Sequence, residues 1–466
     1  MYDPRSSCPA REALSNTPSP AAPLQTDVLV AGAGPAGLMC AREAAGRGLR
    51  VLVLETSGRP GRKLLISGGG KANFTNRRVL PLHYRCGDPA FCGPALKAFS
   101  PAVMERLVAA WGLPVEERGH GQLFLTVPAR DLLHCLMADV QARGGVVHTH
   151  CAARALRRTA DGFRVETDDG PCLARAVVLA AGSPAWPQAG GSPAGFRLAQ
   201  SCGHTLVRPF PALAPLLLPP DALPVPPPSP ARETATPRRL PPAARRGLPT
   251  AARSGPGGPA SSPAADATPT LAGISLPVRI SLPEAGLPPA LARDPVWQDD
   301  LLFTHEGLSG PAALKASLFW EPGMAVQVDF LPGTSFRALL DDPQSGRRSP
   351  LALLRQRLPQ RLAETLLPPE PARRRAAELS RAARETLCAA VHARRFQPCG
   401  VADFRKAEVC GGGIDVREVE PRRLESRLVP GLFLVGELLD VTGLLGGYNL
   451  HWAWASGMAA GRAVLS

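Results

Sequence analysis

The chain has 466 residues, enough for two or three domains and a sizeable core, and it carries a formal net charge of +14. Its 11 cysteines include no C-x-x-C pair, which argues against a disulfide framework, a dithiol redox centre or a zinc ribbon and is typical of a reducing, cytoplasmic compartment. No apolar run reaches the roughly 18 residues of a membrane span, so we expect no membrane insertion.

The first residues predict no folded structure. Residues 1–24 contain Asp3, Arg5, Arg11 and Glu12 and lack an apolar segment, so we interpret them as a disordered leader rather than a signal peptide. The basic balance of the chain permits attraction to acidic partners or nucleic acid, but its arginines are dispersed. We therefore favour a solvated basic surface over nucleic-acid binding.

A strand–glycine–helix–strand unit follows the leader. The apolar run 28–31 precedes Gly32, Gly34 and Gly37, and an alanine-rich helical segment leads to a second apolar strand that ends at Glu55. This order predicts a dinucleotide site, with the diphosphate at the helix N-terminus and the acid on an unphosphorylated ribose, as in FAD or NAD. The expected cofactor-binding residues of this unit are Gly32, Ala33, Gly34, Pro35, Ala36, Gly37 and Glu55.

Residues 58–76 contain cations and glycines that suit the same ligand. Three consecutive glycines, Gly68 to Gly70, allow the backbone to pass close to a flat or phosphorylated group. Two cations, Arg62 and Lys63, come just beyond the second strand. We favour ligand contact over a flexible surface loop. The residues predicted to bind the cofactor here are Arg62, Lys63, Ser67, Gly68, Gly69, Gly70 and Asn73.

The next stretch alternates helices and strands. Residues 89–113 and 131–144 have helical patterns, and 146–148 form a strand in which His148 and His150 alternate with a threonine. Two histidines at this spacing can share a metal, but no third ligand is near them in the sequence, so we predict a solvated face and no metal site.

A hairpin and a further buried strand complete the N-terminal part. The Asp161-Gly162 pair predicts a turn between strands 154–159 and 163–167. The apolar run 176–182 ends in small residues, of which Ala181 and Gly182 are further expected cofactor contacts.

Composition changes sharply in the middle of the chain. Residues 219–269 are rich in proline, alanine and arginine, which predicts a disordered or polyproline-like insert. Strand patterns resume at 274–276 and 278–280 and continue at 301–311 and 325–331. Residues 350–396 have helical patterns, with leucines at helical spacing up to Leu367. The basic helical run near the end of that region is interpreted as a solvated face.

The C-terminal part returns to glycine-rich turns. A strand at 432–435 is followed by small and acidic residues, then by a glycine turn that opens a helix from about 450 to 464. A second such site suggests one long ligand held from both ends of the chain, which favours a flavin dinucleotide. The residues expected to contact it are Gly436, Glu437, Asp440, Gly446, Gly447, Tyr448 and Asn449.

Together these segments resemble the BaiN/YhiN-like flavoproteins, the aminoacetone oxidase family of FAD-binding enzymes. The resemblance covers nearly all of the chain outside the leader and the insert. The motifs that carry it are VLVAGAGPAGL (28–38), GRKLLISGGGKANFTN (61–76), AAGSPAWPQAGGSPAGF (180–196), FTHEGLSGP (303–311) and PGLFLVGELLDVTGLLGGYNLHWAWASG (430–457).

The resemblance implies an α/β fold with a Rossmann-type FAD-binding domain that is split in sequence, a β-rich inserted domain and a small helical subdomain. It implies FAD with its ADP half at Gly32–Gly37 and Glu55 and its isoalloxazine near Gly68–Asn73 and Gly446–Asn449. The expected boundaries are 25–205 and 401–466 for the FAD domain, 206–345 for the β-rich domain and 346–400 for the helical subdomain.

The chemistry suggested is FAD-dependent oxidoreduction, in which hydride passes from NADH or NADPH through the flavin to a small organic substrate such as an activated C=C. His305 is the preferred acid or base, because its pKa normally lies near neutrality, and Tyr448 is the second candidate. Cys410 is a weaker candidate nucleophile. An FAD oxidase or monooxygenase using O₂ and a flavin-containing RNA-modifying or RNA-binding factor remain as alternatives, and the oligomeric state stays open.

Overall fold

A sheet of seven strands, built around the first two predicted strands, organises the molecule. The computed structural model describes residues 23–220 and 271–466, so most of the predicted leader and insert lies outside the described residues. The sheet order is β7-β2-β1-β10-β9-β8, and β20 also pairs with β10. Its strands are β1 Leu24–Ala31, β2 Val51–Glu55, β7 Val146–Thr149, β8 Ala153–Thr159, β9 Gly162–Thr167, β10 Gly170–Leu179 and β20 Leu432–Leu434.

The centre of this sheet is parallel and buried. Strands β7, β2, β1, β10 and β20 run parallel to one another, and Val28, Leu29 and Val30 are completely buried. A continuous apolar run is what a strand covered on both faces requires, because no side chain of the strand reaches water. Strands β8 and β9 form an antiparallel hairpin whose turn includes the predicted Asp161-Gly162 pair.

Helices from both ends of the chain cover the sheet. The last helix, α14, packs along α1, and close approach is possible because α14 has glycines at the contact. A Cβ on Gly457 would lie 2.3 Å from the carbonyl oxygen of Ala36, and one on Gly461 would lie 2.5 Å from that of Cys40. The helices of this part are α1 Pro35–Ala45, α2 Arg62–Gly70, α3 Gly93–Ala98, α4 Pro101–Ala110, α5 Ala129–Ala142, α6 Ala194–Ser201 and α14 Tyr448–Ala463.

Three small sheets connect distant segments around the large one. Two of them each join a strand from the N-terminal half to one from the C-terminal half. The pairs are β4 Tyr84–Cys86 with β21 Val441–Gly443, and β11 Leu206–Ala212 with β19 Val409–Ile414. The third sheet contains β3 Asn73–Asn76, β6 Gln122–Leu125 and β5 Val115–Arg118.

A second sheet of seven strands is inserted between these halves, in the order β17-β16-β13-β14-β15-β12-β18. Helix α8 packs on it, and its buried Lys315 donates to the carbonyl oxygen of Val296 (2.9 Å) and to Oδ2 of Asp299 (2.5 Å). The elements are β12 Leu216–Leu217, β13 Ser275–Ser281, α7 Pro289–Ala292, β14 Gln298–Phe303, β15 Gly307–Ser309, α8 Gly310–Ser317, β16 Val326–Asp329, β17 Arg394–Phe396 and β18 Gly400–Val401.

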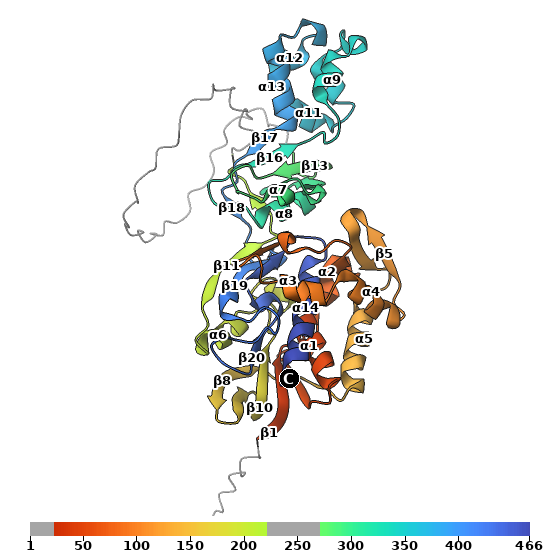
Figure 1. The fold of residues 1–466 in the computed structure, drawn as a ribbon. Helices are drawn as coiled ribbons and strands as arrows, with labels where there is room; N and C mark the ends of the chain where they lie inside the picture. Colours follow the sequence, from red (N-terminus) through yellow and green to blue (C-terminus); the bar gives the residue numbers. More distant parts are fainter. Residues whose placement is uncertain (1–22, 221–270) are drawn as a thin grey trace, which may run out of the picture.

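Five short helices form the end of the molecule farthest from the Rossmann part (Figure 1). His392 anchors them to the inserted sheet, since its Nδ1 lies 2.8 Å from Oδ1 of Asp329 and its Nε2 accepts from the backbone N–H of Phe336 (3.1 Å). The helices are α9 Phe336–Asp341, α10 Pro350–Leu354, α11 Gln360–Leu366, α12 Pro369–Arg373 and α13 Arg381–His392.

The predicted fold class is confirmed: a Rossmann-type α/β part, split in sequence, carries an inserted antiparallel sheet and a helical unit. The boundaries differ in detail. Strands β17 and β18 lie in the inserted sheet rather than in a helical segment. The two strands predicted at 274–276 and 278–280 are one strand, β13. Among the described residues, no helix combines the length and apolar character needed to cross a membrane.

Candidate functional site

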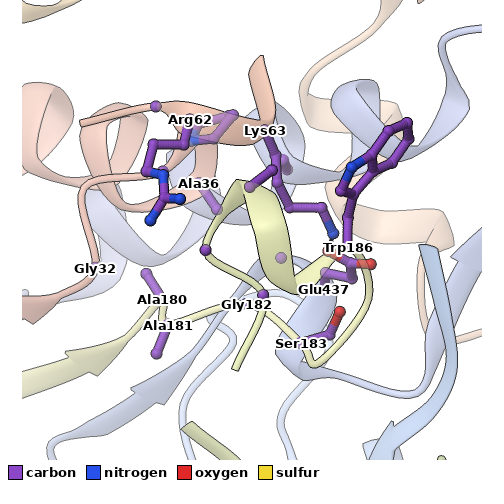
Figure 2. Close-up of a pocket in the computed structure, with 18 of the residues that line it drawn as sticks. Gly32, Ala36, Arg62, Lys63, Ala180, Ala181, Gly182, Ser183, Trp186 and Glu437 are labelled. Atoms are coloured by element: carbon purple, nitrogen blue, oxygen red, sulfur yellow. Dashed lines mark hydrogen bonds and ion pairs between the residues drawn. The ribbon is translucent and has the colours of Figure 1, made fainter. Parts of the chain in front are cut away.

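One large cavity, of about 810 Å³, lies where the N-terminal and C-terminal glycine turns meet (Figure 2). Its volume falls within the range typical of cofactor and ligand sites. Most of the predicted cofactor residues line it, and they come from both ends of the chain. The lining residues that the sequence singled out are Gly32, Gly34, Pro35, Ala36, Glu55, Arg62, Lys63, Ser67, Gly68, Gly69, Asn73, Ala181, Gly182, Gly436, Glu437, Gly446, Gly447 and Asn449.

Five other predicted cofactor residues do not line the cavity: Ala33, Gly37, Gly70, Asp440 and Tyr448. Gly37 is a packing residue, since a Cβ there would lie 1.9 Å from the carbonyl oxygen of Gly32. Asp440 is buried, and desolvation raises the pKa of its carboxyl.

The side formed by Gly32, Gly34 and Glu55, which we call the glycine wall, surrounds the N-terminus of α1. Gly32 has φ +117°, and a Cβ there would lie 2.4 Å from the carbonyl oxygen of Ala180. A Cβ on Gly34 would meet no protein atom within 4 Å, so the space beside it is open to a ligand. Backbone N–H groups and the helix dipole at this terminus favour an anionic group such as a diphosphate.

Glu55 is fixed at the carboxyl end of β2. Its Oε2 accepts from the backbone N–H of Ala33 (3.2 Å), and its Oε1 accepts from the N–H and the hydroxyl of Ser57 (both 2.9 Å). Each carboxylate oxygen has more than one lone pair. The carboxylate therefore keeps capacity to accept from ribose hydroxyls while its orientation is held.

A charged pair crosses the cavity between the two halves of the Rossmann part. Nζ of Lys63 lies 2.6 Å from Oε2 of Glu437, whose Oε1 accepts from the backbone N–H of Cys410 (3.0 Å). Arg62 donates to the carbonyl oxygen of Gln188 (2.8 Å). Figure 2 shows Lys63 and Glu437 entering the cavity from opposite elements, α2 and the turn after β20.

The turn before α14 is held by side chains of α14 itself. Oδ1 of Asn449 accepts from the N–H of Gly443, and Nδ2 donates back to its carbonyl (both 2.8 Å). Nε1 of Trp452 donates to the carbonyl oxygen of Gly436 (3.1 Å). The backbone N–H of Gly436 donates to the hydroxyl of Ser456 (3.0 Å). The free N–H groups at this helix start can stabilise negative charge on a ring carbonyl.

Four other residues line the cavity: Phe124, Trp186, Leu213 and Glu408. We call this set the aromatic wall, after its two aromatic members. Gly68 makes this wall possible, since a Cβ there would lie 2.7 Å from both the Asn73 nitrogen and the Phe124 ring. Trp186 has φ +56°, an unfavourable conformation for a bulky residue, and such strain is concentrated at functional sites. Leu213 and Glu408 stand outside the predicted motifs, whereas Trp186 lies inside a motif of the family resemblance.

Glu408 is the one acidic side chain of the aromatic wall. It lines the cavity, and the residue is exposed there. Desolvation raises the pKa of its carboxyl, and the charge of Lys63 opposes this more weakly. Glu408 therefore holds a proton to higher pH than an ordinary glutamate, which suits a general acid.

The candidates for acid–base or nucleophilic chemistry lie elsewhere. His305 is exposed in the turn between β14 and β15 and does not line the cavity, and neither does Tyr448, whose buried ring lies 4.8 Å from that of His83. Burial raises the pKa of the Cys410 thiol to about 12, with the Glu437 charge adding to the effect. A thiol with this pKa is protonated at neutral pH and is a poor nucleophile.

The residues fit FAD in both chemistry and space. An open glycine cradle, a carboxylate after the second strand and a second helix start surround a cavity large enough for a dinucleotide, which defines a Rossmann-type FAD-dependent oxidoreductase. The chain belongs to the HI0933-like protein Rossmann domain family, whose model matches residues 26–463. The predicted family resemblance is thereby confirmed.

Three relatives span nearly the whole chain. Two proteins named ribosomal RNA dihydrouridine synthase, from Escherichia coli and Haemophilus influenzae, are each 30% identical and cover 94% of this chain and 98% of their own. A 3-dehydro-bile acid delta(4,6)-reductase from Clostridium scindens is 29% identical and covers 93% of this chain and 98% of its own. The similarity therefore extends over the Rossmann part, the inserted sheet and the helical unit alike.

Proposed function

We propose that the protein takes electrons from NADH or NADPH onto FAD and saturates a carbon–carbon double bond conjugated to a carbonyl group. The observation that carries this proposal is the composition of the aromatic wall. Flat apolar side chains and a carboxyl of raised pKa line the same cavity as the glycine wall. An acceptor there would meet both a flavin and a proton donor.

The reaction needs a hydride at the carbon remote from the carbonyl and a proton at the carbon next to it. Bound FAD supplies the hydride chemistry. Glu408 would supply the proton, and the apolar faces of Phe124 and Trp186 would hold the acceptor and exclude water. The N–H groups at the start of α14 would stabilise negative charge on the flavin ring carbonyl.

The names of the relatives support this reaction type. A dihydrouridine synthase saturates a ring double bond of uridine, and a delta(4,6)-reductase saturates a double bond of its bile-acid substrate. Both reactions reduce a C=C. Two relatives that differ in substrate thus share one chemical step, and we transfer that step to this chain.

A uracil base in RNA is a second candidate substrate, and a separate observation supports it. The chain has 53 Lys and Arg against 39 Asp and Glu, a balance that attracts a polyanion. The two relatives of 30% identity are named for ribosomal RNA. RNA modification, an alternative that the sequence alone did not favour, therefore stands beside the small-molecule reductase.

An anaerobic absorbance titration with NADH and NADPH tests the first half-reaction. We expect a yellow protein whose flavin bands bleach with one of the two donors. If neither donor bleaches the flavin and a substrate drives oxygen consumption instead, the protein is an oxidase and the proposal is wrong.

The second half-reaction is tested by giving the reduced protein, in parallel, unmodified ribosomal RNA and a steroid with conjugated double bonds. Reoxidation with formation of dihydrouridine, detected by mass spectrometry of the nucleosides, would assign the RNA substrate. Reoxidation by the steroid alone would assign the small-molecule function. RNA binding should also weaken steeply as salt rises, because phosphate contacts release counterions.

A further inference from the structure

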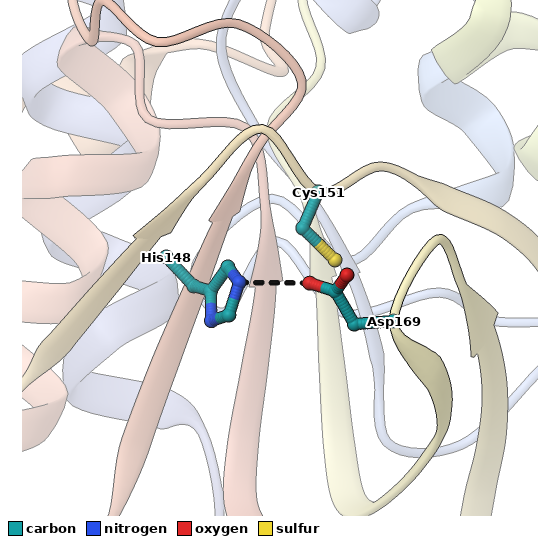
Figure 3. A group of neighbouring side chains, drawn as sticks. All are labelled: His148, Cys151 and Asp169. Atoms are coloured by element: carbon teal, nitrogen blue, oxygen red, sulfur yellow. Dashed lines mark ion pairs between the residues drawn. The ribbon is translucent and has the colours of Figure 1, made fainter.

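A histidine, a thiol and a carboxylate from three separate segments converge (Figure 3), and the thiol residue, Cys151, also lines the cavity. His148 lies near the end of β7, Cys151 lies in the connection to β8, and Asp169 lies in the turn between β9 and β10. Their ligand atoms all lie within 4.8 Å of one another, and Nε2 of His148 is 2.8 Å from Oδ2 of Asp169. We call these three residues the His–Cys–Asp cluster.

The adjacent residue, Asp168, forms an ordinary ion pair with an arginine. Asp168 binds Nε and Nη2 of Arg154 at 2.6 and 3.0 Å and accepts from the N–H of Ala152 at 3.0 Å. Within the described residues, Asp169 has no arginine or lysine partner and meets only His148. Arg154 is engaged by Asp168, so the carboxylate of Asp169 is left for another cation.

The thiol distinguishes this cluster from an exposed histidine–carboxylate pair. Cys151 is only 2% exposed, and Figure 3 shows its sulfur directed toward the carboxylate of Asp169. Its backbone is fixed because its N–H donates to the carbonyl oxygen of Glu55 (3.0 Å). A buried sulfur contributes little to an ion pair between exposed side chains. Thiolate sulfur, imidazole nitrogen and carboxylate oxygen are, however, the three kinds of ligand atom that zinc binds in proteins.

The distances suit one small cation. In a tetrahedral site, zinc bonds of about 2.3 Å to sulfur and about 2.0–2.2 Å to nitrogen and oxygen place the ligand atoms roughly 3.3–3.8 Å apart. Rotation of the half-exposed His148 and Asp169 side chains would open their 2.8 Å contact and bring both ligand atoms up to about 1 Å closer to the thiol. A thiolate and a carboxylate would also balance the charge of a divalent ion.

We propose that His148, Cys151 and Asp169 form a zinc site, with the fourth position left to water. The sequence pointed instead to His148 and His150 and predicted no metal there. The ring of His150 faces Gly58, where a Cβ would lie 2.5 Å from its Nε2, so it takes no part in the cluster. The site would join β7 to the β9–β10 turn, and its metal content can be measured separately from flavin turnover.

The test uses the flavin-loaded protein after removal of metal with a chelator. Zinc is titrated in competition with a chromophoric chelator, and we expect one tightly bound equivalent. Cys151→Ser and Asp169→Asn should each weaken zinc binding at least about tenfold, because each removes one of three protein ligands. Cys399→Ser, which changes an exposed thiol elsewhere, and His150→Ala should bind zinc as the unaltered protein does.

Cobalt provides a second readout that does not depend on affinity. Co²⁺ in a site with a thiolate ligand gives ligand-field bands at wavelengths beyond the flavin absorption, and these should be absent in Cys151→Ser. If Cys151→Ser does not fold, His148→Ala at the exposed end of the cluster gives the same information. Stoichiometric zinc binding that survives both Cys151→Ser and His148→Ala, or no zinc binding at all, would overturn the proposal.

Discussion

The glycine wall and the aromatic wall enclose the same cavity but are built in opposite ways. The glycine wall comes from one continuous stretch, 28–55, in which strand, turn and helix follow one another. The aromatic wall takes Phe124, Trp186, Leu213 and Glu408 from four separate segments. A cofactor-binding wall made by backbone geometry is thus local in sequence, whereas a wall made by side chains depends on the whole fold.

The difference also affects what each wall tolerates. In the glycine wall, backbone atoms and the expected cofactor fill the space around the glycines. A single carbon atom added to one of these glycines therefore impairs either folding or cofactor binding. In the aromatic wall the side chains fill the space, so a substitution changes the chemistry of the acceptor site while the fold persists. Substitutions on the two sides should therefore separate cofactor binding from turnover.

The largest expected effect is at Gly37. Gly37→Val should abolish soluble, flavin-loaded protein, because its Cβ would lie 1.9 Å from the carbonyl oxygen of Gly32, an overlap that costs at least about 4 kcal/mol. Gly34→Ala is the matched control, since its Cβ meets no protein atom within 4 Å.

We expect Gly34→Ala to fold with an unchanged Tm but to bind FAD at least about tenfold more weakly, a loss of about 1.4 kcal/mol. Thermal unfolding and flavin fluorescence measure the two effects. Equal FAD affinity in Gly34→Ala and the unaltered protein would show that the space beside Gly34 is not where the cofactor lies.

The next effect tests the aromatic wall. Glu408→Gln should slow reduction of the acceptor about 100-fold, because it removes the proton donor, while bleaching of the flavin by NADH or NADPH keeps its rate. In the unaltered protein the rate of the acceptor step should fall as pH rises through the raised pKa of Glu408, since the acid must be protonated. Stopped-flow measurement separates the two half-reactions.

Glu306→Gln is the control for this variant, since it removes a glutamate that pairs with Lys406 (2.5 Å) outside the cavity. It should leave both half-reactions unchanged. An acceptor step that is as fast in Glu408→Gln as in this control would exclude Glu408 as the acid.

The two walls also mark how far sequence reasoning reaches. The order of apolar strand, glycines, helix and acid predicted the glycine wall, because each residue type there answers a backbone requirement within its own segment. Glu408 and Leu213 carry no such pattern, and they meet through β11 and β19, two strands about two hundred residues apart in the chain.

The same limit explains the choice of His305 as the candidate acid. Histidine is a common acid or base in enzymes, but the sequence cannot show which carboxyl groups will have their pKa raised by burial. The pKa of Glu408 is raised by its surroundings, and these form only when the chain folds and brings Glu408 to the cavity that Lys63 also lines. The zinc ligands Cys151 and Asp169 are likewise brought to His148 by strand pairing alone.

A third expected effect concerns the support behind the cofactor turns. His451 is completely buried, with Nδ1 2.7 Å from the hydroxyl of Thr75 and Nε2 2.8 Å from the carbonyl oxygen of Phe99. Burial lowers its pKa to about 4, so the folded protein holds it neutral. Below pH 6.5 the unfolded chain binds a proton that the folded protein does not.

The free energy of unfolding should therefore fall by about 3 kcal/mol between pH 6.5 and pH 4 from this group alone. Urea unfolding of the unaltered protein and of His451→Gln, which keeps a hydrogen-bonding side chain but does not titrate, gives the difference. Parallel pH dependence in the two proteins would mean that His451 is not responsible.

The smallest effect is expected at His305, and it tests the boundary of the site. The side chain is exposed, lies outside the cavity and belongs to a turn that Thr304 organises by accepting from the N–H groups of Glu306 (3.3 Å) and Gly307 (3.1 Å). His305→Ala should change FAD affinity, flavin reduction and acceptor reduction by less than about twofold, because a surface substitution that breaks no contact costs less than about 0.5 kcal/mol.

A large loss in the acceptor step alone, with flavin reduction intact, would mean that the inserted sheet moves this turn onto the aromatic wall when the acceptor binds. The acid would then be His305 rather than Glu408.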